Sequence, residues 1–275
     1  MATLWRHLKP THPIPSIRSD IYLNRSGNSP YNFAFRFRRE FIMKKSFLAT
    51  LLAITAPALH AQWAGNAELG YSESSGNSSA EALYLAAEAT HTVDLNILKL
   101  IGRADRQRTD KTLSKELYHL EGQFSHFLSA QRKSYVYANG LYEQDEPSGL
   151  VSRYNLTVGP GWRWAPNERS AIDLELGAGW HNDDYKDNSR DADGWMGRLY
   201  LKGSYAFNEA VKGTAETTER HDAERRLNTT RLGLESALNA HLSLSAQYEY
   251  RYNSKPEAGK RSEDNLTRIT FKYTF

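Results

Sequence analysis

The chain ends with the sequence LTRITFKYTF, residues 266–275, in which apolar and charged or hydroxyl side chains alternate. One side carries Thr267, Ile269, Phe271, Tyr273 and Phe275, and the other carries Arg268, Thr270 and Lys272. Successive side chains of a β-strand point to opposite faces. This period of two therefore predicts a strand with one apolar and one polar face.

The same period recurs from Trp63 onward, in about twelve segments of roughly 10 to 13 residues, and no segment has a helical period. The segment 153–164 is clear, with Tyr154, Leu156 and Val158 on one side. Two segments are weaker. Near 133–144 both phases are aromatic, so the faces stay unassigned, and 211–220 is supported mainly by its neighbours.

The expected connections alternate in length. Short turns fall near 92–94, 129–132, 166–169, 208–210 and 239–241, and longer polar loops near 74–79, 107–114, 145–149, 183–193, 222–226 and 253–264. Turns on one rim and loops on the other are typical of bacterial outer-membrane barrels. The sequence thus predicts an all-β fold, a transmembrane antiparallel up-and-down β-barrel of about twelve strands.

The strands of a soluble β-sandwich or barrel also alternate apolar and polar side chains. The composition of the polar face therefore has to distinguish a soluble protein from a membrane barrel. Here the polar face carries charges of both signs on nearly every strand, which suits a polar lumen. The segments exceed the usual five or six residues of globular strands and match the roughly 9 to 11 residues that cross a bilayer at a tilt. The charged residues predicted to line the lumen are Arg153, Arg163, Asp173, Glu175, Arg198, Lys202, Arg231, Glu235, Glu249, Arg251, Arg268 and Lys272.

Aromatic residues gather near the predicted strand ends, as girdles at the two membrane interfaces do. Examples are Trp63, Trp180 and Trp195. The alternating Phe271, Tyr273 and Phe275 resemble the C-terminal signature by which the barrel assembly machinery recognises outer-membrane barrels. That machinery, membrane lipid and lipopolysaccharide are the expected partners.

The first part of the chain differs in composition. Residues 43–61 combine Met43-Lys44-Lys45, the apolar stretch 47–56 and a small residue at Ala61, which predicts a signal peptide cleaved after Ala61. The alternative to a signal peptide is a membrane anchor, but the apolar stretch is short for one. Since a signal peptide works from the N-terminus, we expect translation to start at Met43, with 1–42 an over-extended reading frame; the alternative is a disordered extension. The mature barrel would then be 62–275.

Composition excludes several classes. The chain of 275 residues has no cysteine, which rules out disulfides and zinc–thiolate sites. The net charge of +3 comes from the first 61 residues, which leave 26 basic and 30 acidic residues after them. Because the residues after 61 are not basic, the charge gives no reason to expect a nucleic-acid partner. No glycine-rich phosphate loop or zinc spacing is present, and no cofactor is expected.

Three stretches resemble the salt-induced outer-membrane proteins of Gram-negative bacteria. They are GNAELGY with SSGNS at 65–71 and 74–78, VGPG at 158–161, and YNSKP at 252–256. The resemblance covers 63–275 and implies an outer-membrane barrel without a defined biochemical role. Residues 1–42 have no counterpart in that pattern.

Enzymatic chemistry has weak support, and we expect a non-enzymatic protein. Ser125 and His126 are adjacent, so on a strand they point to opposite faces and cannot form the pair of a membrane phospholipase. His181 with Asp183 and Asp184 is the nearest approach to an omptin-like protease, but a solvated acidic loop explains it more simply.

The acidic loop is the best local candidate for a metal site. Carboxylates on a loop suit calcium or magnesium, although the spacing matches no EF-hand. The residues of this weak divalent site are Asp183, Asp184, Asp187, Asp191 and Asp193.

Two functions remain open. Twelve strands would enclose a lumen intermediate between side-chain-filled barrels and wide porins, which suits a narrow channel for ions or small solutes. Alternatively, the basic and acidic lumen residues pair with one another and seal a structural, envelope-stress barrel.

Overall fold

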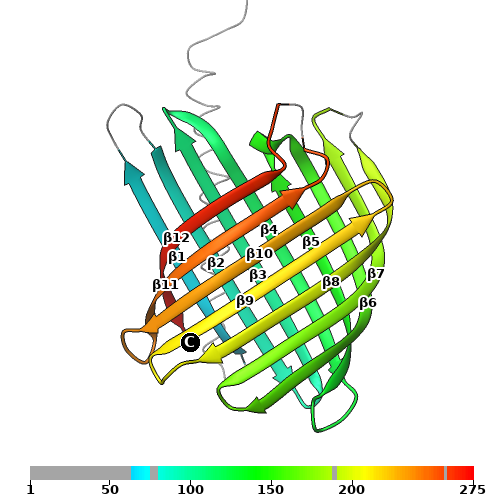
Figure 1. Cartoon of the computed structure of the whole chain (residues 1–275), viewed down its shortest axis with the longest axis vertical. Coiled ribbons are helices and arrows are strands. Elements are labelled where there is room, and N and C mark those ends of the chain that lie inside the picture. Colours follow the sequence, from blue (N-terminus) through cyan, green and yellow to red (C-terminus); the bar gives the residue numbers. More distant parts are fainter. Residues whose placement is uncertain (1–62, 75–79, 188–190, 257–258) are drawn as a thin grey trace, which may run out of the picture. The chain divides into compact units, whose positions relative to one another are not determined.

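A computed structural model describes residues 63–74, 80–187, 191–256 and 259–275. The predicted leader, 1–42 and 43–61, lies outside these ranges. Twelve antiparallel strands form a closed barrel in which each strand pairs with its neighbours in sequence and β1 pairs with β12, as predicted (Figure 1). The strands are β1 Trp63–Ser74, β2 Ala80–Val93, β3 Asn96–Thr109, β4 Thr112–Phe127, β5 Ser134–Asp145, β6 Leu150–Asn167, β7 Ser170–Tyr185, β8 Ala192–Ala206, β9 Val211–Asp222, β10 Arg226–Ala237, β11 Leu242–Asn253 and β12 Glu263–Thr274.

Closure depends on the pairing of the first and last strands. β1 and β12 are in register from Asn66↔Thr274 to Leu69↔Phe271. Beyond β12, Phe275 N–H donates to the Gly65 carbonyl and Gly65 N–H donates to the Phe275 carbonyl, both at 3.0 Å. A closed sheet has no unpaired edge to expose to lipid, which is what a bilayer demands of a β-structure.

The expected difference between short turns and long loops is only partly correct. The loop predicted at 107–114 is a two-residue turn, because β3 continues to Thr109 and β4 begins at Thr112. Asp110 and Lys111 both have positive φ (49° and 65°), as the tight hairpin turns that match strand twist require. We call the end of the barrel with connections 94–95, 168–169 and 238–241 the turn rim. The opposite end, with connections 110–111, 146–149 and 223–225, is the loop rim.

The weak segments of the sequence are now assigned. The segment at 211–220 is β9, a full strand. In β5, Tyr135, Tyr137, Asn139 and Leu141 are buried inside the barrel, whereas residues 136, 138 and 140 lie outside. Two inward tyrosines explain why aromatic content could not define the faces of this strand.

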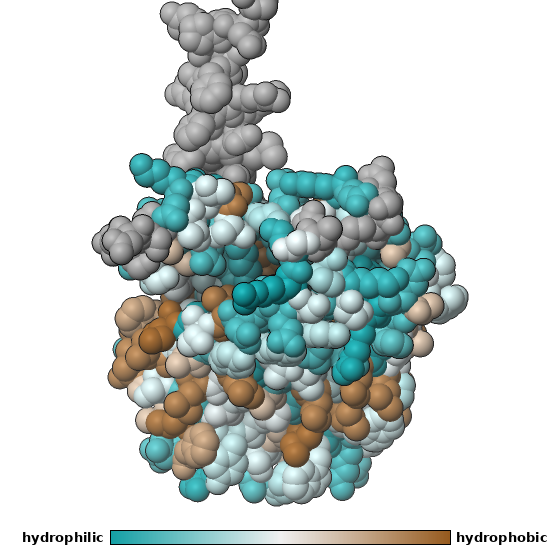
Figure 2. All heavy atoms as spheres, turned by 45° about the horizontal axis from the view of Figure 1, so that its top comes forward, coloured by the Kyte–Doolittle hydropathy of each residue, from teal (hydrophilic) through white to brown (hydrophobic). Residues whose placement is uncertain are grey.

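The outer wall is apolar. Large hydrophobic side chains are exposed along it, including Leu69, Leu100, Leu156, Leu176, Leu201, Leu234, Ile269 and Phe271. On the face in Figure 2 they gather across the wall, with hydrophilic side chains above and below. Burial of each such side chain is worth about 1.5–3 kcal/mol, which favours a nonpolar surrounding for this belt. Among the described residues, no helix is long and apolar enough to cross a bilayer.

Candidate functional site

The inner faces of the strands form a polar lumen. Ten of the charged residues predicted to line it face its internal cavities: Arg153, Arg163, Asp173, Glu175, Arg198, Lys202, Arg231, Glu235, Arg251 and Lys272. Glu249 pairs with Arg231, and Arg268 pairs with Asp105 and lies over the ring of Tyr84, which lines one of the cavities. Both signs are interleaved, so the individual distances decide how much free charge the lumen offers.

Glu175 on β7 is the centre of one cluster and is only 1% exposed. Arg198 Nη1 donates to its Oε2 at 2.6 Å. The other carboxylate oxygen accepts hydrogen bonds from Gln123 Nε2 at 2.7 Å and the Tyr135 hydroxyl at 2.8 Å. A carboxylate this buried is stable only because its charge and both oxygens are matched.

Glu249 on β11 is the centre of a second cluster. Its two oxygens accept from Arg231 Nε at 2.7 Å and from Arg251 Nε at 2.8 Å. Arg231 also reaches Glu216 on β9, at 3.0 Å, and Arg268 lies 3.8 Å from Glu249. Side chains of β9 to β12 are thereby cross-linked inside the barrel.

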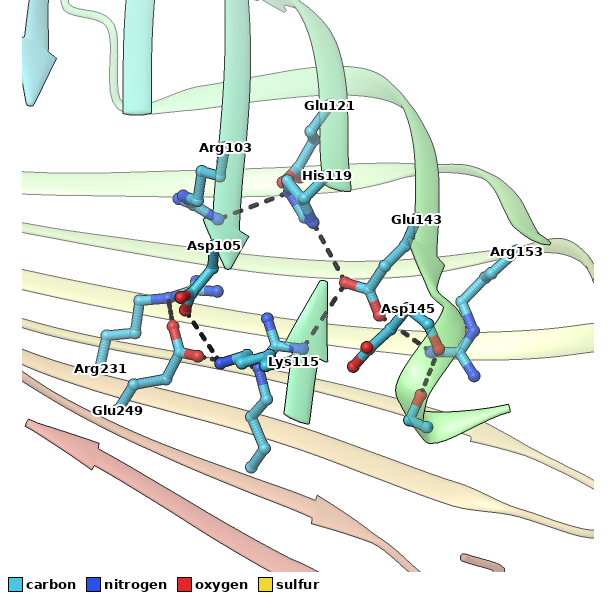
Figure 3. Close-up of polar contacts among 12 residues, drawn as sticks. Arg103, Asp105, Lys115, His119, Glu121, Glu143, Asp145, Arg153, Arg231 and Glu249 are labelled. Carbon is cyan, nitrogen blue, oxygen red and sulfur yellow. Dashed lines mark hydrogen bonds and ion pairs between the residues drawn. The ribbon is translucent and has the colours of Figure 1, made fainter. Parts of the chain in front are cut away.

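A third cluster joins β4, β5 and β6 (Figure 3). His119 lies between two carboxylates, with Nε2 at 3.1 Å from Glu121 and Nδ1 at 3.3 Å from Glu143. Asn139 donates to Glu121 at 2.8 Å, and Arg153 donates to Glu143 at 3.3 Å. The carboxylates of this wall are therefore already engaged.

Toward the loop rim, Asp183 is almost fully buried and binds an arginine from a connecting loop. Arg225, in the β9–β10 connection, places Nη2 2.6 Å from Asp183 and donates from Nη1 to the Tyr185 hydroxyl at 2.8 Å. His181 lies between Asp183 and Asp222, at 3.6 Å and 3.3 Å. Sequence reasoning missed Arg225, because a loop arginine gives no sign that it folds into the barrel.

The predicted divalent site does not assemble. Asp183 points inward, whereas Asp184 accepts from Ser152 at 2.8 Å, and Asp191 accepts from the Tyr185 backbone N–H at 2.6 Å. Alternation along β7 separates the first two carboxylates. In the described part of the chain no three acidic or histidine side chains are grouped to hold a metal. This arrangement does not support a divalent site at Asp183, Asp184, Asp187, Asp191 and Asp193, which stays a prediction.

Two more pairs among the predicted lumen residues lie nearer the turn rim. Arg163 donates to both oxygens of Asp173, at 2.8 and 3.2 Å. Lys272 donates to Glu235 at 2.7 Å. These side chains are more exposed than the Glu175 cluster, so their pairing is weaker and leaves them accessible to solutes.

The described residues enclose several cavities in the lumen, three of them large. A loop-side cavity of about 560 Å³ and a central cavity of about 440 Å³ share Glu143, Arg220, Thr229 and Arg251 in their linings. A third cavity of about 370 Å³, lined by Asn66 among others, adjoins the central one. The loop-side and central cavities adjoin at these four shared residues, and this boundary is named the constriction.

Three arginines in the central cavity were not among the predicted lumen residues. Arg103, on the expected polar face, contacts only His119, at 3.4 Å. Arg132 donates to the Asp94 carbonyl. Arg220 lies on β9, the strand with the weakest sequence signal, and its Nε is buried without a hydrogen-bond partner. Among the described residues none of the three has a carboxylate in ion-pair contact.

The candidate catalytic residues are not arranged as a reaction centre. Ser125 is buried inside the barrel, whereas the neighbouring His126 lies outside and contacts Asn96 at 2.9 Å. His181 is 4% exposed and lies between two aspartates. Neither histidine is placed to activate a nucleophile on an accessible substrate.

These features define a closed β-barrel with an apolar outer wall and a charged lumen. Residues 67–275 match the family described as "Protein of unknown function, DUF481", and the chain belongs to this family. It is 26% identical over 215 residues to the uncharacterized protein YdiY of Escherichia coli (strain K12), covering 76% of this chain and 82% of that protein. Regulation by salt, expected from the resemblance, stays a prediction.

The chain is also similar to solved structures of other proteins. The COG4313 outer membrane channel from Pseudomonas putida F1 has a TM-score of 0.49 at 12% identity, covering 78% of this chain and 95% of that one. The translocator domain of autotransporter NalP from Neisseria meningitidis has a TM-score of 0.44 at 12% identity, covering 86% and 98%.

Proposed function

We propose that this protein is a non-enzymatic outer-membrane barrel whose lumen passes ions or small solutes through a narrow constriction. The exposed apolar belt supports the membrane location, since lipid would cover it. In this proposal the loop rim faces outward, the barrel assembly machinery inserts the chain through Phe271, Tyr273 and Phe275, and lipopolysaccharide surrounds the outer part of the wall.

The observation that carries the proposal is the arrangement of the cavities. The loop-side and central cavities lie on either side of a boundary made of side chains, with Glu143, Arg220, Thr229 and Arg251 common to both. A solute could displace these side chains without unfolding a strand, because only side-chain torsions would have to change. A boundary of this kind suits a narrow channel.

Single-channel recording tests the proposal. The full chain would be expressed with its own leader, purified from membranes and inserted into planar bilayers at several salt concentrations. We expect discrete conductance steps that grow with salt. Folded, heat-modifiable protein that gives no steps in any salt would contradict a channel.

A sealed structural barrel is the second candidate, and the ion-pair network favours it. Arg198–Glu175 and Arg231–Glu249 each join different strands at 2.7 Å or less. Such cross-links stiffen the barrel without any transport. The same recording distinguishes the two functions, because the sealed barrel should give no steps until the network is broken.

A further inference from the structure

The central cavity is unbalanced in its pairing of charges. Each carboxylate in its lining has a donor within 3.1 Å or, for Glu143, 3.3 Å. By contrast, Arg103, Arg132 and Arg220 in the same lining have no carboxylate partner among the described residues. The lining holds nine lysine and arginine residues against six aspartate and glutamate residues, so its net charge is positive.

Arg220 is the strongest element of this imbalance. It is the register partner of Arg198 across the β8–β9 pair, so two arginine side chains project inward side by side. Like charges directly opposite on neighbouring strands repel each other. Glu175 neutralises Arg198, whereas Arg220, at the boundary of the central and loop-side cavities, has no carboxylate in ion-pair contact among the described residues. The Nε atoms of both arginines are buried without a hydrogen-bond partner.

Two further cationic side chains, Arg103 and Lys202, line the same central cavity. Arg103, on β3, reaches only the imidazole of His119, and that nitrogen is also 3.1 Å from Glu121. Lys202 lies 3.9 Å from its carboxylate partner, Glu216, a distance too long for a hydrogen bond. Arginine presents several N–H donors in a planar fork that matches the oxygens of phosphate, sulfate and carboxylate groups.

We propose that the central cavity binds a small oxyanion, with Arg220 as its principal ligand and Arg103 as the second. The volume of about 440 Å³ accommodates such a group with part of its hydration shell, as a water occupies about 30 Å³. The inference deepens the proposed function and rests on it, since the oxyanion would be the solute selected on its way through the lumen.

Equilibrium binding tests the site without requiring conduction. The full chain, purified in detergent, would be titrated with inorganic phosphate, sulfate and acetate by calorimetry at constant ionic strength set with chloride. We expect saturable binding of at least one oxyanion over the chloride background. Preference for phosphate and sulfate over acetate would indicate a tetrahedral ligand, and the reverse a carboxylate.

Variants locate the site. Arg220→Gln and Arg103→Gln should each weaken binding about tenfold, because each removes a charge-assisted hydrogen-bond donor. Arg226→Gln is the matched control, since Arg226 is exposed and paired with Glu219 at 2.6 Å outside the cavity. Heat-modifiable mobility would verify that each variant folds, and Arg220→Lys, which keeps the charge, covers a failure of Arg220→Gln to fold.

The outcomes separate this inference from the channel. No saturable oxyanion binding by the wild type, or binding that the Arg220 and Arg103 variants leave unchanged, overturns the site even if the protein conducts. Binding lost in both variants supports the site even if planar bilayers show no steps, and in that case the channel alone fails.

Discussion

Glu175 shows how single side chains hold the inner wall together. Its carboxylate is enclosed by Arg198, Gln123 and Tyr135. We expect Glu175→Ala to lower the free energy of unfolding by about 3–5 kcal/mol, because it leaves the buried Arg198 uncompensated. Urea titration of the protein in lipid vesicles measures this loss.

The matched control is an exposed pair, Lys255–Glu224, with a distance of 2.9 Å and side chains 58% and 70% exposed. Glu224→Gln should change the unfolding free energy by no more than about 1 kcal/mol. Equal losses for Glu175→Ala and Glu224→Gln would contradict the view that the lumen clusters stabilise the barrel more than surface pairs do.

Gly179 on β7 is required by a close approach between strands. A Cβ at this position would overlap the Leu156 carbonyl oxygen of β6. At Gly203 on β8 an added Cβ meets nothing within 4 Å. We therefore expect Gly179→Ala to abolish or strongly reduce heat-modifiable folded protein and Gly203→Ala to fold as the wild type. Similar yields of the two variants would show that β6 and β7 can separate.

At the scale of elements, period two predicts the strands but not what fills the barrel. The faces of β5 could not be assigned because its inward aromatics pack on glycines of other strands. The Tyr135 ring lies over Gly161, and the Tyr137 hydroxyl lies over Gly177. Such pairs are distant in sequence, so alternation within one strand contains no information about them. For the same reason the sequence did not single out Arg220, because its position opposite Arg198 depends on the pairing of β8 with β9.

The β9–β10 connection is held to the lumen by one arginine. Arg225 is 6% exposed and binds Asp183 and Tyr185. We expect Arg225→Ala to release this connection and to make it sensitive to added protease, measured as the rate of cleavage at the loop rim on intact vesicles. Arg226→Ala is the control, as this neighbouring side chain is exposed. Equal protection in both variants would show that Arg225 does not restrain the connection.

The end of β12 combines closure with the predicted assembly signal. Phe275 exchanges two backbone hydrogen bonds with Gly65, and its ring lies over that glycine. We expect deletion of Phe275 to reduce the amount of folded barrel in membranes several-fold. Phe207→Ala is the control, because Phe207 is an exposed aromatic near the turn rim that takes no part in closure. Equal yields of both variants would contradict a special role for the last residue.

For the whole molecule, the sequence predicts the strand number, the closed topology and the polar lumen, because all three follow from repeated local alternation. It does not predict the degree of sealing, because that depends on distances across the lumen. Arg251 illustrates this: it lies on the expected inner face, yet only the structure shows its Nη1 3.9 Å from Glu143, on the opposite side of the strand order.

The constriction is the feature that decides between a channel and a sealed barrel. Its long cationic side chains, Arg220 and Arg251, line both the loop-side and the central cavity. We expect the double variant Arg220→Ser, Arg251→Ser to enlarge the unitary conductance several-fold, because it removes side-chain volume from the boundary between the two cavities. In a barrel sealed at this level, the variant should create steps where the wild type has none. Arg226→Ser, on the outer wall, should behave as the wild type. An unchanged current in a folded double variant would place the barrier elsewhere in the lumen, with the Glu175 and Glu249 clusters as the next positions to open.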